Sequence, residues 1–176
     1  MGRLKITFLL FFTLTLLSFG QEDQGILWDP DYRLSWSDFK AIPPADSQVA
    51  ATTASGIAYR FSALEEKGKM KVDCSVETFF YPESSWYRPE RANANILSHE
   101  QLHFDISELF ARRMRQKVAG FRFTSEVKAE MRAIYTETIE EMREFQKRYD
   151  QETNYSRAEE KQREWNRMIA QALERK

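Results

Sequence analysis

The stretch from Ser98 to Phe104, SHEQLHF, carries the only two histidines of the 176-residue chain. His99 and His103 stand four positions apart, and Glu100 directly follows the first of them. On a helix, positions i and i+4 project side by side, close enough for two imidazoles to reach one Zn²⁺ at about 2.0–2.1 Å. In such an H-E-x-x-H pattern the glutamate takes a proton from the attacking water and passes it to the leaving amine. The motif therefore predicts a Zn²⁺ site with Glu100 as general base.

The sequence around the two histidines favours a long helix. Asn93 or Asn95 can cap its start, and neither Pro nor Gly occurs from Ile96 until Gly120. One face at helical spacing is formed by Ile96, His99, His103, Ile106, Phe110 and Met114. We expect this face to be buried. Two histidines on a buried face are also compatible with hydrogen-bonded core residues that hold no metal.

The first twenty residues have the pattern of a secretory signal peptide. Two basic residues precede an apolar run from Ile6 to Leu17, and small residues end the segment. The run is short for a membrane span, and no later stretch reaches the required length. We therefore expect an exported protein, periplasmic or extracellular, in which residues 1–20 are removed and residues 21–176 form a single domain.

Charge and cysteine content argue against a nucleic-acid-binding protein and against a fold stabilised by internal disulfides. The formal net charge is −1, and it becomes −3 without residues 1–20, because that segment holds Arg3, Lys5 and no acidic residue. The chain has no basic surface of the kind that binds nucleic acid. Cys74 is the single cysteine, so the chain forms no internal disulfide. The expected partner is a peptide or protein substrate, and the oligomeric state is left open.

Strands are expected before the histidine helix and two more helices after it. Residues 57–61 and 70–80 alternate apolar and polar side chains around a tip at 65–69, which predicts an antiparallel hairpin. Shorter strands are expected at 26–28 and 34–36.

A second apolar stripe, from Val127 to Tyr149, predicts a helix that is capped by Thr124 or Ser125 and lies antiparallel to the first. Ser156 and Glu159 form a capping box for a third helix. The apolar face of that helix is expected to hold Trp165, Met168, Ile169 and Leu173. The fold class is therefore α+β, a small antiparallel sheet followed by three helices, with HExxH on the first long helix.

The third metal ligand is the open question of the sequence. A catalytic zinc has three protein ligands, and with both histidines used the third must be Asp, Glu or, less usually, Tyr. If the first two helices turn back at about Gly120, the histidines lie level with residues 139–143, where Glu141 flanks the apolar stripe. Glu141 would complete a set of two histidines and one glutamate, as in thermolysin. It is equally compatible with a surface carboxylate.

Five pieces of the chain resemble a family of exported bacterial proteins catalogued as predicted zinc-dependent proteases (domain of unknown function 922). They are WSDF at 36–39, ASGIAY at 54–59, SW at 85–86, ILSHEQLHFDISELFARR at 96–113, and YDQETNYS at 149–156 with Gln162 and Trp165 after it. The resemblance covers nearly the whole mature chain, and its HExxH run is the chemically specific part. It implies a zincin-like fold and a zinc-dependent protease.

One departure from that family pattern concerns the third ligand. In the family, YD-x-x-T is followed by x-His, and the matching position here is Tyr155. A tyrosine there can bind zinc or donate to an oxyanion, so the resemblance makes Tyr155 the candidate ligand and Glu141 the geometric alternative. The substitution also allows a weakened or lost metal site. The leading hypothesis is an exported zinc metallopeptidase, and the alternative is a non-catalytic envelope binding module on a zincin-like scaffold.

Overall fold

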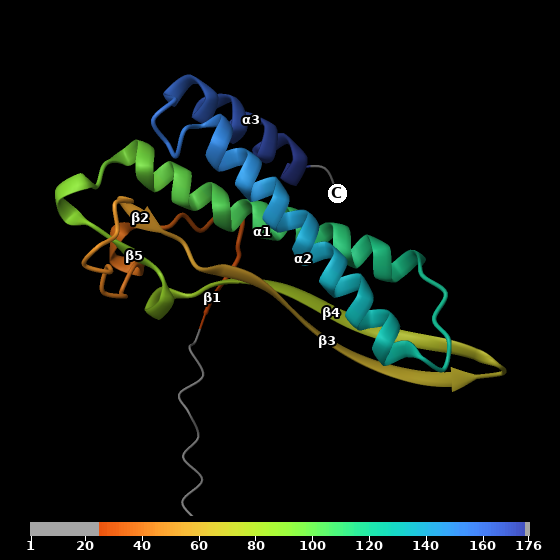
Figure 1. Ribbon diagram of the computed structural model, residues 1–176. Coiled ribbons are helices and arrows are strands. Elements are labelled where there is room, and N and C mark those ends of the chain that lie inside the picture. The colour runs from red at the N-terminus through yellow and green to blue at the C-terminus, as the bar shows by residue number, and fades with distance from the viewer. Residues whose placement is uncertain (1–24, 175–176) are drawn as a thin grey trace, which may run out of the picture.

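The computed structural model describes residues 25–174, which form a long antiparallel hairpin, a second small sheet and three helices (Figure 1). The predicted signal peptide, residues 1–20, lies outside the described residues. The predicted class, α+β with a small antiparallel sheet followed by three helices, is confirmed.

The sheet is built on a long hairpin, as the alternation predicts. β3 (Ser55–Glu66) and β4 (Lys69–Phe80) pair antiparallel over their full length, with Ser55 opposite Phe80. Lys67 and Gly68 connect them with φ values of 53° and 72°, the positive values that a tight two-residue hairpin turn requires. β1 (Ile26–Leu27) adds to the far end of β4, which gives the strand order β1-β4-β3.

The strand predicted at 34–36 is wrong. The chain forms a 3₁₀ helix, Trp36–Asp38, at this place. The Asp38 carboxylate accepts from the backbone N–H and the hydroxyl of Ser35 at 2.7 and 2.9 Å. These local bonds compete with strand pairing, which explains why the apolar stretch does not extend the sheet.

A second, two-stranded sheet lies beside the start of the first helix. β2 (Ala51–Thr52) pairs antiparallel with β5 (Trp86–Tyr87). β2 continues directly towards β3, and the hydroxyl of Thr53 donates to the backbone oxygen of Glu100 at 3.2 Å. This bond fixes the small sheet against the histidine motif.

The central element is α1 (Ala94–Gly120), which packs on the hairpin and on both other helices (Figure 1). Asn93 caps it, because its side-chain oxygen accepts from the backbone N–H of Ile96 at 2.9 Å. α2 (Val127–Glu152) returns antiparallel, and α3 (Glu159–Glu174) packs on both. No helix within residues 25–174 is long and apolar enough to cross a membrane.

The predicted ends of α2 and α3 are wrong in detail. Glu126 is the residue at the N-cap of α2, and Thr124 instead binds the Glu130 carboxylate through its N–H and hydroxyl. Ser156 precedes α3 by three residues and has a φ of 70°, so the capping box does not form. On α3, Trp165 and Ile169 are buried as expected, whereas Met168 is 44% exposed.

Candidate metal centre

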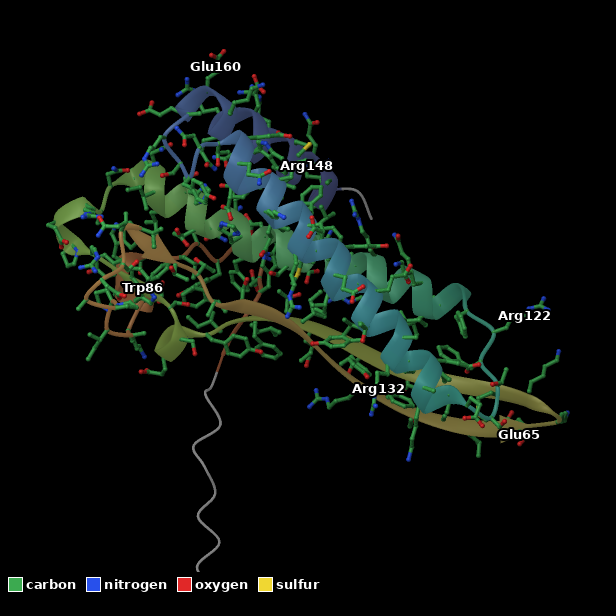
Figure 2. All side chains as sticks on the ribbon, viewed as in Figure 1. Glu65, Trp86, Arg122, Arg132, Arg148 and Glu160 are labelled. Atoms are coloured by element: carbon green, nitrogen blue, oxygen red, sulfur yellow. The ribbon has the colours of Figure 1, made fainter. Side chains whose placement is uncertain are left out.

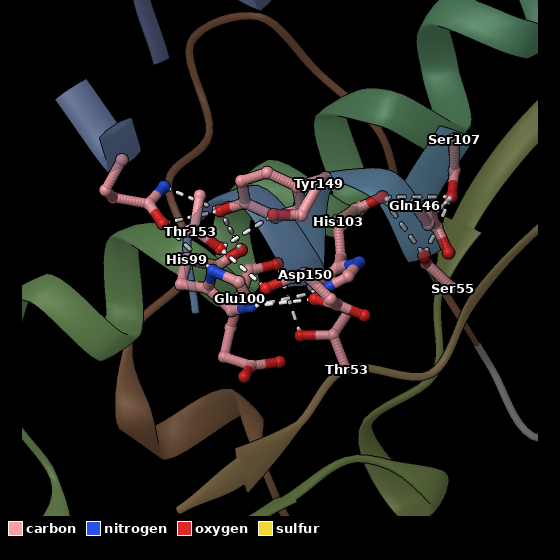
Figure 3. Close-up of polar contacts among 11 residues, drawn as sticks. Thr53, Ser55, His99, Glu100, His103, Ser107, Gln146, Tyr149, Asp150 and Thr153 are labelled. Carbon is pink, nitrogen blue, oxygen red and sulfur yellow. Dashed lines mark hydrogen bonds and ion pairs between the residues drawn. The ribbon is translucent and has the colours of Figure 1, made fainter. Parts of the chain in front are cut away.

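Three side chains from two helices converge at one point. His99 and His103 project from α1, and Asp150 projects from the last turn of α2. Asp150 Oδ1 lies 3.1 Å from His99 Nε2 and 3.0 Å from His103 Nε2, and the two Nε2 atoms lie 3.3 Å apart. We call these three atoms the donor triangle (Figure 3). Of the described residues, these three form the group of His, Cys, Asp and Glu that could hold a metal ion.

The size of the donor triangle matches a tetrahedral metal site. Ligand atoms about 2.0–2.1 Å from a tetrahedral Zn²⁺ stand about 3.3–3.4 Å from one another. The observed separations of 3.0, 3.1 and 3.3 Å are within about 0.3 Å of that value. Two imidazole nitrogens and one carboxylate oxygen are a donor set that zinc uses in catalytic sites.

A buried amide fixes the orientation of the His99 ring. Gln162, on α3 and 1% exposed, uses its two Nε2 hydrogens on the Tyr149 hydroxyl and on Asn166 Oδ1, at 2.6 and 2.8 Å. Its Oε1 lies 2.9 Å from His99 Nδ1, so that nitrogen is the donor. The neutral His99 ring therefore carries no proton on Nε2, and this bare nitrogen faces a carboxylate oxygen. Two lone pairs 3.1 Å apart require a proton or a cation between them.

Tyr149 supports the same histidine from the α2 side. Its ring stacks on the His99 ring with centroids 4.5 Å apart and 21° between the planes. Its hydroxyl lies 3.2 Å from the His99 backbone oxygen, to which it donates. Tyr149 is fully buried, and burial raises the pKa of its hydroxyl far above the ordinary value. The tyrosine thus acts as a neutral support.

The electrostatics of the donor triangle favour a carboxylate beside a cation. Burial opposes ionisation of Asp150, but hydrogen bonds from His103 and from a His99 ring protonated on both nitrogens outweigh this effect and lower the pKa of Asp150 far below its ordinary value. Burial likewise opposes the charging of His103. Its contact with Asp150 and the nearby Glu100 charge reverse that effect and raise its pKa. A cation at the donor triangle is therefore stabilised by Asp150 and Glu100 together.

The Glu100 side chain lies outside the donor triangle. Its carboxylate points away from the dashed contacts in Figure 3 and makes no hydrogen bond or ion pair with residues 25–174, although Glu100 is only 5% exposed. It lines a cavity of about 690 Å³ that also contains His99, His103 and Asp150. We call this the histidine cavity. An unpaired carboxylate that lies beside atoms able to hold a metal ion and is open to a cavity can accept a proton from a bound molecule.

The structure brings His99 and His103 together as the motif predicts, and it brings in a residue that the sequence analysis missed. The carboxylate that lies beside the two histidines belongs to Asp150, and Glu141 is not part of this group. Glu141 instead binds Lys117 Nζ at 3.1 Å, near the other end of α1. Tyr155 lines the histidine cavity but is 54% exposed, and its hydroxyl makes no hydrogen bond with any described residue.

The misplaced third residue has a simple geometric cause. The prediction folded the helices back at Gly120, but α1 and α2 are joined by residues 121–126. The midpoint of the connection therefore lies about three to four residues later. For each residue by which the midpoint moves, the residue of α2 that lies beside a given residue of α1 changes by two. A shift of six to eight residues moves the expected level from residues 139–143 to about 145–151, a range that contains Asp150. The YD pair of the resemblance was the available signal for Tyr149 and Asp150.

The comparisons with known proteins can be set beside this geometry. Residues 82–157 match the family model of a bacterial protein of unknown function (DUF922). The matched stretch holds α1 and α2 in full, and with them the donor triangle, Glu100 and Tyr155. The match supports the family identity that the sequence motifs indicate. Neither a curated protein nor a solved structure matches the chain.

Proposed function

We propose that the donor triangle binds Zn²⁺ and that the chain is an exported, zinc-dependent metallopeptidase of zincin-like type. The observation that carries the proposal is the donor triangle itself, with one oxygen and two nitrogens 3.0 to 3.3 Å apart in the spacing of a tetrahedral site. The commitment of His99 Nδ1 to Gln162 supports it independently, because it leaves Nε2 free for a metal.

Each residue then has a defined task. His99, His103 and Asp150 would hold the metal, and all three line the histidine cavity, through which a substrate would approach. When bound, zinc supplies a Lewis acid that lowers the pKa of water to about 7 and polarises a carbonyl. Glu100 takes a proton from the attacking water and transfers it to the leaving amine, since its carboxylate is unpaired and opens into the same cavity.

The alternative function, a binding module with a degraded metal site, was motivated by Tyr155 at the place of the family histidine. The geometry supplies a third donor in Asp150 without any contribution from Tyr155. The proposal therefore requires neither a tyrosine ligand nor a further histidine.

The metal assignment is tested by elemental analysis of the purified mature protein after dialysis against a weak chelator. We expect about one zinc per chain in the wild type and almost none in His103→Ala. Loss of zinc from the wild type even after reloading with excess zinc would refute the site. A full load of iron with little zinc would instead favour the oxygenase chemistry that two histidines and one carboxylate also support.

The general base is tested with two matched substitutions. Glu100→Gln should keep its zinc and lose peptide hydrolysis by about 10² to 10⁴-fold, the usual contribution of a positioned acid–base group. Glu141→Gln removes the same charge at the Lys117 contact and should hydrolyse the same quenched-fluorescent peptide library at the wild-type rate. Undiminished hydrolysis by Glu100→Gln would rule out its role. Export is tested by fractionating cells that express the full chain and locating the shortened protein.

A further inference from the structure

Two arginines stand on the rim of the histidine cavity without a carboxylate partner. Arg91 ends the short 3₁₀ helix Pro89–Arg91 before α1, and Arg157 follows the last turn of α2. Both line the histidine cavity, both are exposed, and neither forms an ion pair with residues 25–174. In Figure 1 the segments that carry them lie at the same end of the molecule as β2 and the start of α1.

A hydrogen bond holds the side chain of Arg91, and a left-handed turn precedes Arg157. Arg91 Nη1 donates to the backbone oxygen of Gln48 at 2.6 Å, which places its guanidinium against another residue of the cavity wall. Arg157 follows three consecutive residues with positive φ, namely Asn154, Tyr155 and Ser156, at 47°, 52° and 70°. Such a left-handed run costs about 1–2 kcal/mol per non-glycine residue.

The strained turn persists because its surroundings fix it. The backbone N–H of Tyr155 donates to Asp150 O at 2.8 Å, and Asn95 on α1 donates to Ser156 O. Thr153 is fully buried, and its hydroxyl donates to Tyr149 O at 2.8 Å. Backbone strain of this kind concentrates at ligand-binding segments. The turn that begins at Asp150 therefore fixes the backbone from which the Arg157 side chain reaches the cavity rim.

The charged side chains of the histidine cavity would be unbalanced by a bound metal ion. The described ionisable residues of the cavity are the two arginines, the two histidines, Glu100 and Asp150. With neutral histidines the two carboxylates cancel the two guanidiniums, so a bound dication leaves the cavity with an excess of about two positive charges. The chain as a whole has a formal charge of −1. A positive cavity in an acidic protein attracts anionic substrates and repels cationic ones.

We propose that Arg91 and Arg157 select peptides that carry a carboxylate near the bond to be cleaved. This inference rests on the proposed function and names its substrate class. The guanidinium fork binds a carboxylate through two parallel hydrogen bonds, which fixes position as well as charge. The carboxylate is supplied by an acidic side chain or by the C-terminus of the peptide.

The test measures binding separately from hydrolysis. Zinc-supplemented Glu100→Gln protein is titrated into fluorescent random octapeptide pools that are identical except for one fixed Glu, Gln or Lys, each with an amidated C-terminus. A fourth pool has Gln and a free C-terminus. We expect the Glu pool or the free-terminus pool to bind about threefold to tenfold more tightly than the amidated Gln pool at low salt. Which of the two binds more tightly identifies the source of the carboxylate.

Variants assign the preference to the two arginines. The double variant Arg91→Gln/Arg157→Gln in the same background should bind all pools equally, whereas Arg91→Lys/Arg157→Lys should keep part of the preference. Arg122→Gln is the matched control, because Arg122 is exposed at the opposite end of the molecule (Figure 2). It should leave the preference unchanged.

The inference is overturned if the four pools bind equally, if the Lys pool binds best, if no pool binds, or if the double Gln variant retains the full preference. Zinc content and hydrolysis of the amidated Gln pool by the wild type are recorded separately. Failure of the proposed function is therefore distinguishable from failure of the selection.

Discussion

Two cavities of similar volume lie against different faces of α1, and each is lined by one aspartate. The histidine cavity, about 690 Å³, holds Asp150, and the other, about 670 Å³, holds Asp105. We call the second one the Asp105 cavity. His103 and Asp105 are two positions apart on α1, so their side chains leave the helix about 200° apart. The same helix thus positions two carboxylates in two environments.

The two aspartates differ in what faces them. Asp105 Oδ1 accepts from Trp28 Nε1 at 2.9 Å and from Gln101 Nε2 at 3.0 Å, and the exposed Arg33 Nη1 lies 3.8 Å from it. Burial raises its pKa, against the lowering effect of these bonds. Asp150 faces two imidazole nitrogens, and its pKa is lowered. A buried carboxylate is therefore not by itself a metal site. The difference is that the N–H groups of Trp28 and Gln101 cannot bind a metal, whereas the two imidazoles beside Asp150 can either carry a proton or bind a metal ion.

The largest expected effect comes from exchanging each aspartate for asparagine. Asp150→Asn removes the anionic ligand, so the zinc affinity of the variant should fall by more than about 100-fold. Loss of a residue that only orients a ligand usually costs less than this. Competition with a chromophoric zinc chelator measures the change. Asp105→Asn keeps an oxygen that can accept from Trp28 and Gln101, and it should bind zinc like the wild type. Equal zinc affinities of the two variants would show that Asp150 contributes no more to metal binding than Asp105 does.

A smaller effect is expected for the amides that contact the two sites. Gln162→Leu removes the acceptor of His99 Nδ1–H, and zinc affinity should fall by about 10 to 100-fold. Gln162→Glu restores an acceptor and should recover most of that loss. Gln101→Leu makes the same change beside Asp105, and its zinc affinity should be unchanged. If Gln162→Leu and Gln101→Leu lower zinc affinity equally, Gln162 does not orient the metal ligand.

The smallest effect is a difference in pH dependence between metal-free proteins. The raised pKa of His103 stabilises the fold fully below about pH 6.5, and this stability is lost as pH rises through the folded-state pKa. The lowered pKa of Asp150 adds stability above about pH 4, which is lost as pH falls through its folded-state pKa. In chelator, urea unfolding should therefore show the largest advantage of wild type over Asp150→Asn near pH 5.

Asp105 should have the opposite dependence. Because its pKa is raised in the folded protein, its protonation favours folding, and that stability is lost as pH rises above about 4 through the raised pKa. Asp105→Asn and wild type should be alike near pH 3, and the variant should gain relative stability towards pH 7. A flat difference across this range would show that burial does not penalise the Asp105 charge.

Local sequence was sufficient for most of the secondary structure. Alternation from Ile57 to Phe80 predicted the hairpin because one side chain in two faces the helices. The spacing from Val127 to Tyr149 predicted α2, whose buried stripe is the expected one. Helix ends were less accurate, since Thr124 and Ser156 have hydrogen-bond partners that lie outside a capping box. Likewise, the hydrogen bond from the Ser35 N–H to the Asp38 carboxylate favours a 3₁₀ helix at the place where a strand was expected.

The candidate site was predictable only in part. The sequence determined that His99, Glu100 and His103 share one helix, because a four-residue spacing has one geometry on a helix. It did not determine the third side chain, because the level at which α2 passes α1 depends on where the connection bends. Gln162, from a third helix, and Arg157, from a strained turn, approach the histidines only through tertiary packing. Residues within one helix are related by its repeat, whereas residues on different helices are related by packing, which a single sequence does not display.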